Sequence, residues 1–101
     1  MKKTILLLYL TTTAYYLSFS QWIQQPSPTT NLLRSVCFID ENTGFIVGEF
    51  GTILKTTNGG TTWTSISSGT GNTLYSVKFP DATTGYIAGD NGTIMKTADG
   101  G

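Results

Sequence analysis

Histidine is absent from this chain of 101 residues, and cysteine occurs only once, as Cys37. A single cysteine excludes a disulfide within the chain, and the lack of histidine removes a principal zinc ligand. We therefore predict no metal site and no bound cofactor. Cys37 is interpreted as an ordinary strand residue, because the equivalent position later in the sequence holds Lys78.

Charged residues are scarce as well, at 12% of the chain, with six Lys or Arg and six Asp or Glu. Two of the six basic residues, Lys2 and Lys3, lie at the N-terminus. Residues 21–101 therefore hold four basic and six acidic side chains, which gives a formal charge of −2. Such a mildly acidic surface lacks the basic patch that binds nucleic acids or anionic membranes. We therefore expect no nucleic acid partner.

Long apolar runs are confined to the N-terminus. Lys2 and Lys3 precede the apolar residues 5–10, and Ser18-Phe19-Ser20 places small residues at the two cleavage positions. This pattern predicts a signal peptide over residues 1–20. The apolar stretch is shorter than the roughly 20 residues that a membrane-spanning helix needs. We expect an exported protein (periplasmic, at the cell surface or secreted) without stable membrane insertion after cleavage.

What the chain does contain is a repeat of 41 residues. Residues 31–60 reappear as residues 72–101, and 17 of the 30 paired positions are identical. Trp22 and Trp63 keep the same spacing, so the repeat extends further upstream. A period near 40 with short β segments is typical of a propeller or array, in which one unit cannot bury its own faces.

Each repeat divides into short apolar segments between turns rich in Gly, Asn, Asp and Thr, which predicts strands. We predict an all-β chain that forms a partial β-propeller of about two four-stranded blade equivalents. Its predicted parts are an outer strand over 21–25, a full blade over 33–66 (with its fourth strand over 61–66) and three strands of the next blade over 74–97.

Two blade equivalents cannot close a ring, because a propeller usually has 4–8 blades. The further blades must come from missing sequence or from other copies of the chain. Since the sequence stops at Gly101, inside a turn, we expect a truncated fragment of a longer protein. The alternative is that several copies assemble.

The turn over residues 56–63 (TTNGGTTW) resembles the Asp-box, or BNR repeat, with the pattern Ser/Thr-x-Asp-x-Gly-x-x-Trp. The preceding G-x-x-G-T-I-x-K-T unit resembles the propeller repeat of the photosystem II assembly and stability factor family. The positions that match the box in the two repeats are Thr56, Asn58, Gly60 and Trp63, then Thr97, Asp99 and Gly101.

The resemblance implies a structural role for the box, because in the family it lies on a hairpin away from the active centre. It also implies a role in assembling a membrane protein complex, with basic residues on the binding face. Some Asp-box proteins are glycoside hydrolases, which usually need two facing carboxylates. A sialidase would also need an arginine cluster, and Arg34 is the sole arginine. A fragment of a sialidase-like hydrolase stays a third hypothesis.

Two exposed aromatic positions differ between the repeats. Phe50 corresponds to Asn91, and Tyr75 corresponds to Arg34. Variable positions on a repeated scaffold can carry binding specificity, so Phe50 and Tyr75 form the candidate ligand surface, with packing between blades as the alternative. The hypothesis is an exported, non-enzymatic propeller scaffold that mediates protein or carbohydrate interaction.

Overall fold

The computed structural model describes residues 21–101, so the predicted signal peptide lies outside the described residues. No helix within this range is long and apolar enough to cross a membrane. The elements are β1 (Leu33–Phe38), β2 (Gly44–Gly48), η1 (Glu49–Gly51), β3 (Ile53–Thr56), β4 (Thr64–Ile66), β5 (Leu74–Lys78), β6 (Gly85–Gly89), η2 (Asp90–Gly92) and β7 (Ile94–Thr97).

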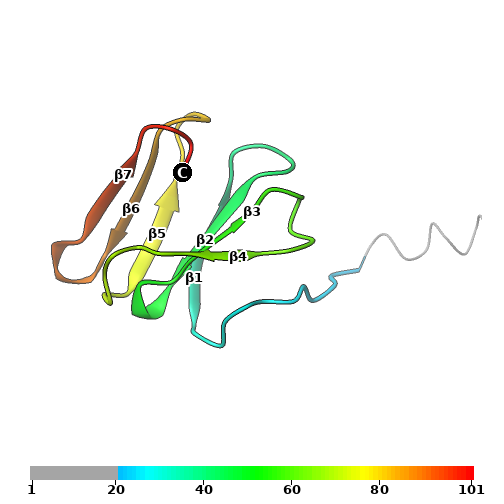
Figure 1. Ribbon diagram of the computed structural model, residues 1–101, viewed down its shortest axis with the longest axis horizontal. Helices are drawn as coiled ribbons and strands as arrows, with labels where there is room; N and C mark the ends of the chain where they lie inside the picture. The colour runs from blue at the N-terminus through cyan, green and yellow to red at the C-terminus, as the bar shows by residue number, and fades with distance from the viewer. Residues whose placement is uncertain (1–20) are drawn as a thin grey trace, which may run out of the picture.

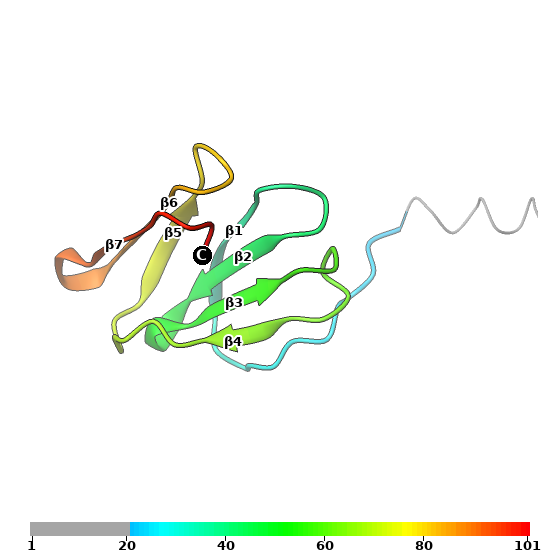
Figure 2. The ribbon, with the colours of Figure 1, turned by 45° about the horizontal axis from the view of Figure 1, so that its top comes forward.

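The strands form two antiparallel sheets that stand side by side, as Figure 1 and Figure 2 show. The first has the order β1-β2-β3-β4 and the second the order β5-β6-β7. In both sheets every strand pairs with the one that follows it in sequence, through short turns. The expectation of an all-β chain is confirmed.

Two predicted segments differ from the structure. The fourth strand was expected to begin at Thr61, but β4 covers only Thr64–Ile66, because the amide of Thr62 bonds to the side chain of Asn58 in the preceding turn. Residues 21–25, the predicted outer strand, form no strand and are exposed. A strand needs a neighbour to satisfy its amides, and none lies beside these residues.

The hydrophobic core lies between the two sheets. Phe45 and Val47 of β2 and Ile53 of β3 pack against Leu74 and Val77 of β5, and all five are buried. This interface therefore holds the two blades together.

Equivalent residues of the two repeats show what the stacking contributes. Ile53 faces the second sheet and is 8% exposed, whereas its equivalent, Ile94, is 78% exposed. Val77 faces the first sheet and is 2% exposed, whereas its equivalent, Val36, is 59% exposed. Each exposed sheet face thus carries the same apolar residue as the equivalent face that is buried between the two sheets.

The matched pair Ile53 and Ile94 allows a direct test of this packing. Ile53→Ala should lower the free energy of unfolding by about 2 kcal/mol or more, the cost of deleting a buried aliphatic side chain. Ile94→Ala, at the exposed equivalent position, should change it by less than about 0.5 kcal/mol. Urea unfolding at low protein concentration measures both, and equal losses would contradict the assignment of the core.

Candidate functional site

The antiparallel order gives each blade two ends with different turns. At one end, here called the box pole, lie the β1–β2 turn and the turn over residues 56–63, with their equivalents in the second blade. At the other end, here called the linker pole, lie η1, η2 and the β4–β5 linker over residues 67–73. The predicted box residues lie at the box pole, whereas Phe50 and Tyr75 lie at the linker pole.

The buried hydroxyl of Thr56 organises the first turn of the box pole. Its Oγ1 accepts the amide of Gly60 at 2.9 Å and the amide of Asn58 at 3.3 Å, and donates to Asn58 Oδ1 at 2.9 Å. Asn58 Oδ1 in turn accepts the amide of Thr62 at 3.0 Å. These polar groups satisfy one another within the turn, which is a structural role.

The aromatic ring of Trp63 covers this turn. The ring lies edge-on to Phe38 of β1, with 5.9 Å between the centroids, and a Cβ at Gly60 would lie 3.6 Å from it. Trp63 therefore joins the turn to the innermost strand of its own blade, a packing role for the predicted box residue.

The second repeat builds the same turn as far as Gly101. Thr97 Oγ1 donates to Asp99 Oδ1 at 2.7 Å and accepts the amide of Gly101 at 3.0 Å. The hydrogen bond from Thr97, with smaller contributions that include the charge of Lys55, lowers the pKa of Asp99. The Asp99 carboxylate is thus stabilised in its ionised form by a hydrogen bond within the turn.

Asp40 and Asp81 close the remaining turns of the box pole. Asp40 Oδ1 accepts the amides of Asn42 and Thr43, each at 2.8 Å, and Asp81 makes the equivalent pair of bonds. These backbone hydrogen bonds favour the charged carboxylate and lower the pKa of both residues. The turn carboxylates therefore serve the fold.

The linker pole is built differently, on a β-bulge at the start of each inner strand. The pairing of β1 with β2 shifts between Leu33 and Ser35, which leaves Arg34 as the extra residue. The pairing of β5 with β6 shifts in the same way around Tyr75. Bulges redirect a side chain away from the sheet and are frequent beside functional sites. The two repeats thus present different side chains from the same backbone position.

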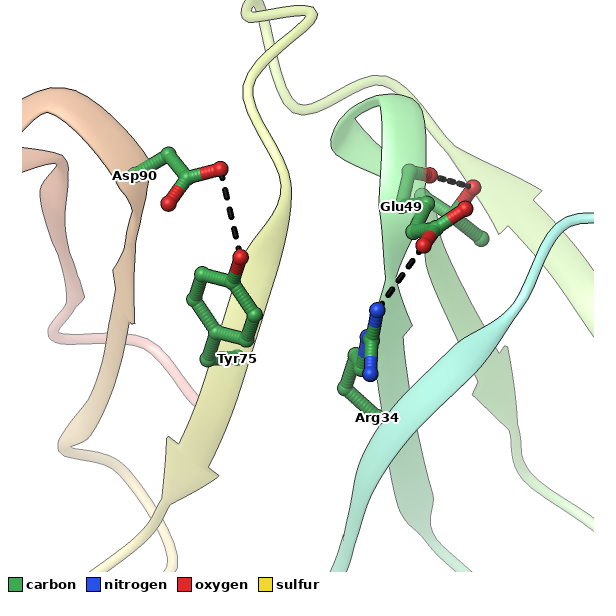
Figure 3. Close-up of polar contacts among 5 residues, drawn as sticks. Arg34, Glu49, Tyr75 and Asp90 are labelled. Carbon is green, nitrogen blue, oxygen red and sulfur yellow. Dashed lines mark hydrogen bonds and ion pairs between the residues drawn. The ribbon is translucent and has the colours of Figure 1, made fainter.

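The redirected side chains form a polar row across the two blades, which Figure 3 shows. Arg34 Nη2 donates to Glu49 Oε1 at 2.8 Å, and the Arg34 guanidinium carbon lies 5.6 Å from the ring centroid of Tyr75. The Tyr75 hydroxyl donates to Asp90 Oδ2 at 3.3 Å. We call these four residues the linker-pole row. The row offers carboxylate, guanidinium and aromatic groups to solvent within one small area.

Phe50 lies in η1 at the same pole and has an unusual backbone. Its φ of 56° and ψ of 35° place it in the left-handed region, and its side chain is 70% exposed. Asn91 has the same angles in η2, and asparagine tolerates them far better than a bulky residue does. The first repeat therefore holds a strained, exposed aromatic where the second has a favourable turn residue.

The ligand surface predicted from the sequence shares one residue, Tyr75, with the linker-pole row, and its role in binding stays a prediction. Phe50 and Tyr75 do lie at one pole, as members of the candidate ligand surface. The structure also brings Arg34, Glu49 and Asp90 together with Tyr75, a grouping that the sequence analysis does not predict. The signal that could have found them is the 15-residue spacing from Arg34 to Glu49, which recurs from Tyr75 to Asp90.

Known proteins share this fold and sequence pattern. A family model described as photosynthesis system II assembly factor YCF48, of the PSII BNR type, matches residues 14–69. The chain belongs to this family. No curated protein sequence matches the chain.

Solved structures agree with the family. YCF48 bound to D1 peptide is 33% identical, with a TM-score of 0.67 over 78% of this chain and 26% of that chain. YCF48 from Cyanidioschyzon merolae is 26% identical, with a TM-score of 0.71 over 79% of this chain and 27% of that chain. The chain thus spans about a quarter of each YCF48 structure. The predicted BNR-repeat partial propeller is confirmed.

The buried hydroxyl at the box pole of this YCF48-family chain should be needed for stability. Thr56→Val keeps the shape but leaves the buried Gly60 amide without its acceptor, which should cost about 1–3 kcal/mol. The exposed neighbour change Thr57→Val is the control and should have little effect. Chemical denaturation measures both, and a neutral Thr56→Val would show that the hydroxyl is dispensable.

Stability should also depend on pH through Asp40 and Asp81. The pKa values of both carboxyl groups are lower in the folded protein than in the unfolded chain, where they lie near 3.9. Their contribution to the free energy of unfolding is therefore complete above the unfolded pKa, and it is lost as the pH falls through the folded pKa values. Asp40→Asn with Asp81→Asn keeps an acceptor oxygen but removes the titration. Thermal unfolding between pH 5 and pH 2 should show a flatter profile for this double variant, with the non-titrating, exposed change Thr57→Val as the control that keeps the wild-type slope.

Proposed function

We propose that this chain is part of an exported, non-enzymatic β-propeller scaffold that binds a segment of a partner protein at its linker pole. One observation carries the proposal: the bulges place Arg34 and Tyr75, which differ between otherwise similar repeats, side by side and exposed. The box turns lie at the opposite pole, so the side chains at positions 34 and 75 can differ without altering those turns.

A protein ligand is favoured over a carbohydrate by the family. A YCF48 structure contains a D1 peptide, so a protein segment is a ligand known for at least one relative. The linker-pole row suits such a ligand, since its carboxylates can accept main-chain amides and Arg34 can donate to carbonyl oxygens. Tyr75 and Phe50 add aromatic area, which is typical of interface anchors.

The state of the carboxylates supports a role without catalysis. A general acid at neutral pH needs a raised pKa, whereas the pKa values of Asp40, Asp81 and Asp99 are lowered by hydrogen bonds within their own turns. Asp40 and Asp81 are held by the same bonds in both repeats, which is the pattern of a structural device. These residues therefore suit a scaffold better than a glycoside hydrolase.

Assembly of a membrane protein complex is the more specific candidate function, and the family description favours it. Export rests on the N-terminal pattern of Lys2, Lys3 and the apolar residues 5–10. Co-purification of the tagged chain with a membrane complex would support the assembly role. Recovery of the chain with soluble exported proteins alone would instead support a general scaffold.

Peptide binding and stability should respond in opposite directions to one substitution. Phe50→Asn installs the residue of the second repeat, which should raise the free energy of unfolding by about 1 kcal/mol through relief of left-handed strain. The same change removes an exposed aromatic anchor and should weaken binding of the D1 peptide. Fluorescence anisotropy with labelled peptide and urea unfolding measure the two effects.

Two further variants locate the binding surface. Tyr75→Ala should weaken the same peptide about tenfold, as expected for an interface aromatic. Lys96→Ala, on the exposed face of β7, is the control and should bind as the wild type does. Wild-type affinity in both Phe50→Asn and Tyr75→Ala, or no binding of the peptide by the wild type, would contradict the proposal.

A further inference from the structure

Asparagine is a thermolabile residue, and its side-chain amide is lost most readily before glycine, which has no Cβ to shield its amide nitrogen. The chain contains two such pairs, Asn58-Gly59 and Asn91-Gly92. The three other asparagines precede leucine or threonine: Asn31, Asn42 and Asn72. The two Asn-Gly pairs lie in different turns at opposite poles, so the structure decides how each one reacts.

The reaction at such a pair takes place within the chain. The glycine amide nitrogen attacks the asparagine Cγ, and the new C–N bond closes a five-membered imide. Ammonia leaves with the side-chain nitrogen and the proton of the glycine amide. Water then opens one of the two imide C–N bonds, which gives aspartate or isoaspartate. The asparagine side chain must therefore be free to turn towards the backbone, and the glycine amide must not be held elsewhere.

Asn58 meets neither condition. Its Oδ1 accepts the amide of Thr62 at 3.0 Å and the hydroxyl of Thr56 at 2.9 Å, and its Nδ2 donates to the Thr62 hydroxyl at 2.8 Å. The Gly59 amide donates to the Asn42 carbonyl in the adjacent turn at 2.8 Å. Both reacting groups are therefore fixed in place by the box pole.

Asn91 is held much less firmly. Its side chain is exposed, and its Nδ2 donates to Asn72 Oδ1 at 3.1 Å. This is the one hydrogen bond that the Asn91 side chain makes within residues 21–101. In the same range the Gly92 amide makes no bond to a second turn of the kind that holds Gly59. Rotation of the Asn91 side chain thus breaks a single exposed hydrogen bond.

The turn around Asn91 is also easy to open. None of the three residues of η2 is buried, whereas the turn around Asn58 contains the buried residues Thr56 and Gly60. The bond from the Thr93 amide to the Asp90 carbonyl, at 3.1 Å, closes η2. Exposed turns with few buried contacts open locally at a low cost in free energy. The peptide group between residues 91 and 92 can therefore reorient without disturbing the core.

The exposure of this position is a property of the turn, as the first repeat shows. There the β4–β5 linker lies against η1, where a Cβ at Gly51 would collide with the Thr70 carbonyl. Phe50, the equivalent of Asn91, is nevertheless 70% exposed. A linker packed against η2 in the same manner would therefore leave the Asn91 side chain in solvent.

We propose that Asn91 is a site of spontaneous deamidation in the native chain, whereas Asn58 is protected by its turn. The product carries a carboxylate directly after Asp90, so it adds negative charge beside the linker-pole row. The product also lacks the amide that donates to Asn72 Oδ1. Two acceptor oxygens then face each other, which weakens the contact between the β4–β5 linker and η2.

The test is incubation of the purified chain in mildly alkaline buffer, followed by proteolysis and mass spectrometry of the peptides. In the native chain, Asn91 should convert to aspartate and isoaspartate about tenfold or more faster than Asn58, because its turn opens more readily. In concentrated urea, where neither turn persists, the two rates should approach each other. Equal rates in the native chain, or faster conversion of Asn58, would overturn the proposal.

Two variants separate the effect of the turns from that of the local sequence. Thr56→Val removes the hydroxyl that donates to Asn58, so it should speed conversion of Asn58 and leave the rate at Asn91 unchanged. Asn91→Gln keeps an amide but requires a larger ring, so conversion at this position should fall sharply while Asn58 reacts as in the wild type. Unchanged protection of Asn58 in Thr56→Val would contradict the role given to its turn, and undiminished conversion in Asn91→Gln would contradict the imide route.

Discussion

The structure depends on the packing of one sheet against the next. A small antiparallel sheet has two faces, and the strands of this chain carry apolar side chains on both, so that a single sheet cannot be stable in water. The contacts of Phe45 and Ile53 with Val77 bury one face of each sheet. Turns, bulges and linkers act by keeping the two sheets in the register that this packing requires.

Much of this architecture could be predicted from the sequence, because the repeat supplies an internal comparison. Strand positions follow from apolar residues that recur after 41 positions, and turns follow from Gly, Asn and Asp. The beginning of β4 could not be predicted in this way. The amide of Thr62 bonds to the side chain of Asn58 and is therefore not available to pair with β3, which shortens the strand. Which of the two hydrogen bonds forms depends on the three-dimensional geometry of the turn.

The site was less accessible to sequence reasoning for a physical reason. Bulges at Arg34 and Tyr75 arise from strand pairing and have no local sequence signature here. Without the bulge, an alternating pattern would direct these side chains onto a sheet face, and their meeting with Glu49 and Asp90 would not be expected. Phe50 differs from Asn91 in the sequence, but its positive φ and the strain that follows are visible only in three dimensions.

The connection from β4 through the linker to β5 has a consequence for the history of such molecules. Because strands pair only within their own sheet and each blade packs only against its neighbours, a duplication of 41 codons adds one blade of the same design. Blade number can then grow or shrink by whole units. Single residues at the bulges, such as Arg34 and Tyr75, can diverge independently in each repeat while the turns keep their conformation.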